Sequence, residues 1–170
     1  MRFQLEPQSL ITASTQFWEQ MLCMHLEPLP ESEVFCVDVG HLKGYVDLSG
    51  KWKGRIEVRL AKSLAYAATA AMMMQPIEEV SEADMLDAIR EIANMIAGGI
   101  KSSLPRPCAM TVPESEVANE GICTCPGAEA TLSIAFQHES GSLMVRVLEE
   151  ECEACSEPGG GAVEASTVTA

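Results

Sequence analysis

Basic side chains are scarce in this sequence. Its 170 residues contain 11 Lys and Arg against 25 Asp and Glu, which gives a formal net charge of −14 at pH 7. Phosphate contacts need clustered Lys and Arg, so this balance argues against a nucleic-acid-binding function. We therefore expect no nucleic acid among the partners.

Long apolar runs are also missing. The longest, residues 64–74, is shorter than the roughly 20 residues that a transmembrane helix needs. The first eight residues contain a charge and a proline where a secretory signal has its apolar core. With 47% hydrophobic residues, the composition predicts a compact cytoplasmic protein without a membrane contact.

Composition changes near the end of the chain. Residues 150–170 combine acidic residues with a Gly-Gly-Gly run and with Ser, Thr and Ala. Such segments cannot bury enough apolar surface to fold, so we expect a disordered acidic tail there. Residues 1–149 then form one domain, which is long enough to bury a core.

Seven cysteines occur without an export signal, so mostly reduced thiols are expected. Three have apolar neighbours and are predicted core residues: Cys23, Cys36 and Cys108. The other four form a CxC followed by a CxxC: Cys123, Cys125, Cys152 and Cys155. Zinc binding, surface redox chemistry and incidental cysteines all stay open for these four, but CxC is a poor zinc spacing and we expect no metal.

Hydrophobic periodicity and breaker residues predict an alternation of helices and strands. Helices are expected over about 8–26 and 62–74, and from near Ser81 to Pro105. Strands are expected near 34–39, 43–49, 54–60, 107–112, 129–136 and 142–148. The predicted fold is α+β, with two long helices packed on an antiparallel sheet of about six strands. A helix followed by three strands occurs twice, which indicates an internal pseudo-repeat.

Six of the eleven basic residues lie within one short segment. They are Lys43, Lys51, Lys53, Arg55, Arg59 and Lys62. Two interpretations remain open: a solvated strand edge, or a surface that receives an acidic protein partner.

The third helix separates into two faces, because residues three, four and seven apart lie on the same side. One apolar stripe holds Met85, Ile89, Ile92, Ile96 and Ile100, flanked by Ala93, Ala97 and Met95. Nearly opposite lie Asp87, Glu91, Asn94 and Gly98, at i, i+4, i+7 and i+11. A carboxylate and a carboxamide therefore stand side by side, one turn before a bare glycine.

A solvated polar face is one interpretation of this pattern. Asn and Gly are poor helix formers, however, and each Gly costs on the order of 1 kcal/mol relative to Ala. Placing Asn94, Gly98 and Gly99 inside a helix therefore needs a reason. Close helix packing and the approach of a partner molecule are the two candidates.

The segment from Glu91 to Gly98 resembles the signature helix of the CheX/CheC chemotaxis phosphatases. That pattern is Asp or Ser, three residues, Glu, two residues, Asn, and a proline about twenty residues later. Asp87, Glu91 and Asn94 match it, and Pro113 comes slightly early. Gly99 departs from it, since many relatives have Asn there. A weaker likeness extends over residues 10–148.

The resemblance implies a phosphatase that dephosphorylates the phospho-aspartate of a CheY-type response regulator. Asn94 would position the attacking water, Glu91 would pair with the receiver's lysine, and Asp87 and Gly98 would contact the partner. It also implies a homodimer and no cofactor bound by this chain, because the receiver supplies Mg²⁺. The alternative is a non-catalytic module that binds a phosphorylated receiver or a flagellar or chemotaxis assembly.

The first helix lacks a second copy of the pair. Its corresponding stretch runs from Glu19 to Leu22, with Leu where the pattern needs Asn. One site is therefore expected, as in CheX, rather than the two of CheC.

Overall fold

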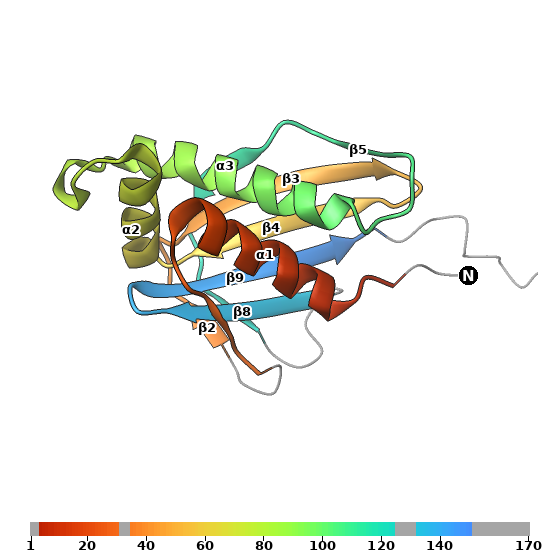
Figure 1. Ribbon diagram of the computed structural model, residues 1–170, viewed down its shortest axis with the longest axis horizontal. Helices are drawn as coiled ribbons and strands as arrows, with labels where there is room; N and C mark the ends of the chain where they lie inside the picture. The colour runs from red at the N-terminus through yellow and green to blue at the C-terminus, as the bar shows by residue number, and fades with distance from the viewer. Residues whose placement is uncertain (1–3, 31–34, 125–131, 151–170) are drawn as a thin grey trace, which may run out of the picture.

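One antiparallel sheet with helices on a single face forms the body of the molecule (Figure 1). The computed structural model describes residues 4–30, 35–124 and 132–150. In spatial order the strands are β1 (Glu27–Pro28), β8 (Leu132–His138), β9 (Gly141–Glu149), β4 (Gly54–Leu60), β3 (Leu42–Gly50) and β5 (Cys108–Met110). β6 (Glu114–Val117) also pairs with β3, which makes a seven-stranded sheet.

Three α-helices occur in the described residues: α1 (Pro7–Leu22), α2 (Lys62–Met73) and α3 (Glu82–Lys101). A single 3₁₀ turn, η1 (Ile77–Glu79), links the last two. α1 and α3 lie side by side across the sheet, and α2 stands at the end where α3 begins (Figure 1). This arrangement confirms the mixed α+β class and the antiparallel sheet. None of these helices is both long and apolar enough to cross a membrane.

Most predicted elements occur within a few residues of their expected bounds. α1 ends four residues early, because Cys23 adopts a left-handed conformation (φ 53°) and its N–H bonds to the carbonyl of Trp18. The strand expected over 34–39 is β2 (Phe35–Val37), which pairs outside the main sheet with β7 (Ile122–Thr124). β1, β6 and β7 were not expected from the sequence.

The core lies between the helices and the sheet, and the isoleucine stripe of α3 supplies much of it. The five predicted stripe residues are at most 1% exposed, and Ala93 and Ala97 are fully buried. The placement of Met95 beside this stripe was wrong, since its side chain is 41% exposed. Met95 follows Glu91 by one turn and so shares the outer face of the helix.

A glycine on β3 allows α3 to lie close to the sheet. A Cβ built at Gly44 would lie 2.6 Å from the carbonyl oxygen of Ile89 and 3.1 Å from the Cβ of Ala93. No larger residue fits there without a backbone shift. The contact fixes which side of α3 faces the sheet, and therefore which side faces solvent.

The cysteine expectations need correction. Cys36 and Cys123 form a disulfide between β2 and β7, so Cys36 is neither a reduced thiol nor a core residue, and Cys123 is not free to bind zinc. Cys23 is exposed, and only Cys108 packs against the core as expected. The remaining three cysteines lie outside the described residues, as does the predicted tail beyond residue 150.

The disulfide closes a loop of 87 residues, so it restricts the unfolded chain strongly. We predict that the C36S/C123S double variant loses roughly 2–5 kcal/mol of unfolding free energy. Its melting temperature should fall by about 5–15 °C. Differential scanning calorimetry with and without dithiothreitol checks this. The double variant is the control, because its melting temperature should not change with the reductant. Identical wild-type melting in both buffers would contradict the prediction.

Candidate functional site on the outer face of α3

A capping box fixes the beginning of α3. The backbone N–H of Asp84 donates to the Ser81 hydroxyl at 3.1 Å, and the Ser81 N–H donates to the Asp84 carboxylate at 3.0 Å. Hydrogen bonding to the Asp84 carboxylate, first from the Ser81 backbone N–H and then from the Ser81 hydroxyl, lowers the pKa of the Asp84 carboxyl. The predicted start of this helix is thereby confirmed, and two free N–H groups of its first turn are satisfied.

The uncovered side of α3 holds all four residues singled out in the sequence. Asp87, Glu91 and Gly98 are exposed, and Asn94 is half-buried. Because the helix is continuous, the eleven residue steps from Asp87 to Gly98 span about 16 Å along one face. Glu91 and Asn94 occupy its middle, three residues apart.

The charged groups on this face differ in how they are paired. Asp87 forms an ion pair with Arg90, one turn along the helix, and both side chains are substantially exposed. Sequence reasoning did not single out Arg90. By contrast, the side chains of Glu91 and Asn94 form no hydrogen bond or ion pair with any part of the chain that the structure describes. A carboxylate and a carboxamide are thus available to a partner.

The two adjacent glycines of α3 have different surroundings. A Cβ at Gly99 would lie 3.1 Å from the Cβ of Ala13, so Gly99 lets α1 approach. A Cβ at Gly98 would meet nothing within 4 Å. Close helix packing therefore explains why residue 99 is a glycine. No contact among the described residues explains the glycine at position 98.

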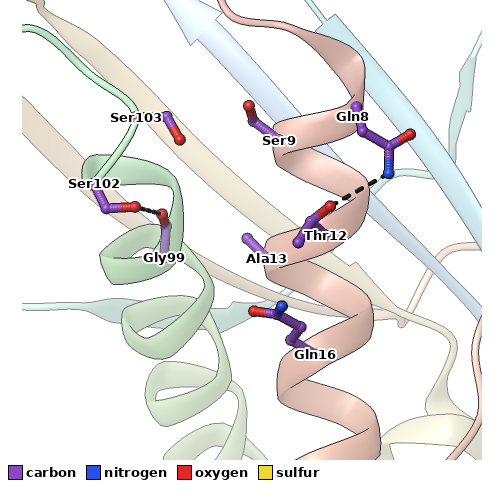
Figure 2. A pocket seen from close by; sticks show the side chains of 8 residues that line it. All are labelled: Gln8, Ser9, Thr12, Ala13, Gln16, Gly99, Ser102 and Ser103. Carbon is purple, nitrogen blue, oxygen red and sulfur yellow. Dashed lines mark hydrogen bonds between the residues drawn. The ribbon is translucent and has the colours of Figure 1, made fainter.

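A shallow polar hollow of about 320 Å³ separates the last turns of α3 from the first turns of α1 (Figure 2). Thr12, Gln16, Ser102 and Ser103 are among its lining residues, and none of the lining residues is charged. The Ser102 hydroxyl donates to the carbonyl oxygen of Gly99 at 2.6 Å, which satisfies one free carbonyl at the helix end (Figure 2). The neutral lining offers no charged group for catalysis.

α1 offers no matching pair. Leu22, at the position where a second site needs Asn, is 7% exposed and belongs to the core. The Glu19 carboxylate lies 3.0 Å from His25 Nδ1. The proline that the resemblance includes, Pro113, is half-buried in the loop between β5 and β6.

Half of the six basic side chains between residues 43 and 62 pair with acids of the sheet itself. Glu57 is only 5% exposed and lies within 4 Å of three cations. They are Lys43, Arg59 and Arg146, at 3.7, 3.2 and 3.2 Å. Arg55 pairs with Asp47 at 2.7 Å. Lys43 and Arg59 pair with a buried carboxylate and Arg55 pairs with Asp47, so the interpretation of the segment as an open surface for an acidic partner is not supported at these three positions.

His41 belongs to the same charged cluster. It is 2% exposed, and burial, followed by the nearby Arg59 and Lys43, lowers the pKa of its imidazole while a bond to Asp38 opposes the shift. The neutral ring accepts from the Arg59 guanidinium through Nε2 at 2.9 Å and donates to the Asp38 carbonyl through Nδ1 at 2.7 Å. The cluster lies on the face of the sheet opposite α3, and so it is separate from the Glu91–Asn94 pair.

The sequence of the segment that includes α3 and most of the sheet identifies the family. A family model described as "Chemotaxis phosphatase CheX" matches residues 42–137, which is more than half of the chain and includes all of α3. This chain belongs to the CheX family. The resemblance carried by the α3 motif is thereby confirmed at the level of the family.

Solved structures share the CheX fold. CheX from Vibrio vulnificus matches with a TM-score of 0.67 and 17% identity, over 88% of this chain and 100% of that one. CheX from Desulfovibrio desulfuricans matches with a TM-score of 0.63 and 22% identity, over 84% and 97%. A chain of the CheX–CheY–BeF₃–Mg²⁺ complex from Borrelia burgdorferi matches with a TM-score of 0.63 and 15% identity, over 87% and 100%. No curated protein matches the chain in sequence.

The glycine pair generates a stability prediction. Replacing Gly98 with Ala should raise the unfolding free energy by up to about 1 kcal/mol, because Ala favours the helix and the new methyl group meets nothing. Gly99→Ala is the matched control, since it gains the same propensity but crowds Ala13 and should be less stable than Gly98→Ala. Urea denaturation measures both, and a Gly98→Ala variant less stable than Gly99→Ala would contradict the assignment.

Proposed function

We propose that this CheX-family chain hydrolyses the phospho-aspartate of a CheY-type response regulator, using the outer face of α3. The proposal is carried by Glu91 and Asn94, which face solvent and have no partner among the described residues, on a helix within the match to the chemotaxis phosphatase family model. A neighbour of the same fold was solved together with CheY, BeF₃ and Mg²⁺, which supports a receiver of this type as the partner.

Asn94 positions the water. Hydrolysis of an acyl phosphate forms a bond from the water oxygen to phosphorus, breaks the bond from phosphorus to the aspartyl oxygen, and releases inorganic phosphate with the carboxylate restored. Such transfers depend on in-line positioning and on electrostatic stabilisation more than on covalent help. A carboxamide can accept from the water and donate to a phosphoryl oxygen at once. Its half-buried position limits the rotamers that Asn94 can adopt.

Glu91 sets the docking register by pairing with the receiver's active-site lysine. One turn of helix separates it from Asn94, so the ion pair holds the carboxamide over the phosphorylated pocket. Asp87 contacts the rim of the receiver as part of its ion pair with Arg90 rather than as a free carboxylate. Gly98 lets the receiver's surface approach the helix backbone.

No metal or cofactor belongs to this chain in the proposal. The Mg²⁺ that neutralises the phosphoryl oxygens comes with the receiver. The protein acts in the cytoplasm as a homodimer joined through its sheets, whose edge strands have free backbone groups. Analytical ultracentrifugation measures that assembly, and a monomer at micromolar concentration would contradict it.

The central test is the variant Asn94→Ala. It should reduce the stimulated release of phosphate from the receiver at least about 100-fold, because the water loses its positioning group. Its melting temperature should stay close to that of the wild type, since the side chain makes no bond within the described residues. Asn119→Ala, an exposed loop amide, is the matched control and should keep full activity.

A panel of phosphorylated receivers, with continuous detection of released phosphate, supplies the measurement. A wild-type protein that binds the phosphorylated receiver without accelerating release would identify a binding module instead. Retained stimulation by Asn94→Ala would reject the mechanism.

The neighbouring acid should behave differently. Glu91→Gln keeps the shape of the side chain but removes the charge that pairs with the receiver's lysine. We predict a rise of about tenfold in the receiver concentration at half-maximal rate. At high salt this rise should be smaller, because salt screens the ion pair. An unchanged half-maximal concentration would contradict the docking role.

A further inference from the structure

A second hollow, of about 690 Å³, opens at the end of α3 where Gly98 lies. Its lining comes from the last turn of α3 and from the segment that leads into β5: Gly98, Lys101, Ser102, Arg106, Pro107 and Cys108. Unlike the neutral hollow beside α1, it is lined by two cations and by no acid. It therefore has the charge to hold an anionic group.

Arg106 is exceptional among the arginines. Within the described ranges, every other arginine has a carboxylate partner. Arg106 is exposed and forms no hydrogen bond or ion pair with any described residue, and the same holds for the Lys101 ammonium. Because no described carboxylate pairs with them, Arg106 and Lys101 can bind an anionic group of another molecule.

The hollow lies within reach of the proposed docking face. Gly98 follows Asn94 by one turn and lines the hollow, and Lys101 follows Asn94 by two turns, which is about 10 Å along the helix axis. A typical protein interface covers about 800 Å² on each partner. A receiver domain centred over Asn94 therefore also covers Lys101 and Arg106.

Charge changes sign along this face. Glu91, and Asp87 paired with Arg90, lie on the N-terminal side of Asn94, and Lys101 and Arg106 lie on its C-terminal side. This arrangement favours a partner that places a cation over Glu91 and an anion over the hollow. A partner docked in the reverse orientation meets like charges at both ends.

We propose that this hollow receives an acidic side chain of the response regulator, and that Lys101 and Arg106 are specificity-determining residues that select receivers with an acid at that position. The proposal rests on the function proposed above. The Arg106 guanidinium suits a carboxylate because its fork of N–H groups can bond both oxygens. Lys101 adds a second, more flexible positive charge.

Charge reversal tests the proposal with the full chain and the receiver that responds best in the phosphate-release assay. Arg106→Glu, in a loop, should raise the receiver concentration at half-maximal rate by about tenfold, and Lys101→Glu should act in the same direction. The maximal rate should stay within about twofold, because neither group touches the reacting atoms. Lys62→Glu, an equal charge change at the start of α2 and at the opposite end of the molecule, should have no effect (Figure 1).

Rescue identifies the occupant. Acidic surface residues of the receiver are replaced by Lys one at a time, and one replacement should restore the half-maximal concentration with Arg106→Glu while weakening the wild-type pair. Effects of Arg106→Glu equal to those of Lys62→Glu, or the absence of any rescuing position, would overturn the proposal. So would a fall in maximal rate, or inhibition by inorganic phosphate that Arg106→Glu abolishes, since the hollow would then hold a phosphoryl group.

The two proposals fail separately. A wild-type chain that stimulates no receiver, or an Asn94→Ala variant that keeps stimulation, rejects the phosphatase function. Stimulation that depends on Asn94 but not on Arg106 or Lys101 rejects only the specificity role of the hollow.

Discussion

The contact between α3 and the sheet at Gly44 controls what this molecule presents to solvent. Because β3 has no side chain there, the backbone of Ile89 lies directly against the strand, and the isoleucine stripe fills the core on either side. Burial of the stripe fixes the rotation of the helix about its axis. Glu91 and Asn94, nearly opposite the stripe, are then held outward on an element whose beginning is capped and whose packing leaves little freedom. The proposed site, which needs a rigid carboxamide, is therefore built on a helix alone.

The two faces of the sheet differ in how their charged side chains are arranged. On the face opposite α3, a buried glutamate and an aspartate pair with Lys43 and three of the described arginines, Arg55, Arg59 and Arg146. On the α3 side the acids lie in the first half of the helix, and two cations without a described carboxylate partner, Lys101 and Arg106, lie at its end. A surface that is acidic at one end and basic at the other favours one orientation of a partner, and it does so before close contact forms.

Sequence patterning was sufficient for the parts of the structure that depend on local physics. The apolar period, the Ser81–Asp84 cap and the alternation of β4 predicted α3 and the central strands closely. β1 and β6 were missed because strands of two and four residues with exposed positions leave no alternation to detect. The disulfide was missed because it joins residues 87 positions apart, a proximity that only the tertiary fold creates. The internal repeat and the domain boundary at residue 149 stay predictions.

In the candidate site, too, the sequence predicted what depends on local helical spacing and missed what depends on the tertiary fold. The motif placed Asp87, Glu91, Asn94 and Gly98 on one face, because helical spacing is enough to do so. Helical spacing also brings Arg90 next to Asp87, three residues before it, although this ion pair was not singled out. The motif could not show that Arg106 lacks a carboxylate partner among the described residues, since that depends on side chains brought together by the fold. Nor could it separate Gly99, which packs against α1, from Gly98, which faces open space.

The most direct test of the account is an NMR titration that follows the side-chain amide of Asn94. Addition of the responding receiver, activated with beryllofluoride and Mg²⁺, should shift this signal together with the backbone signals of Glu91 and Gly98, and leave those of β8 unchanged. A receiver that binds while the Asn94 amide and the outer face of α3 stay unshifted would contradict the account.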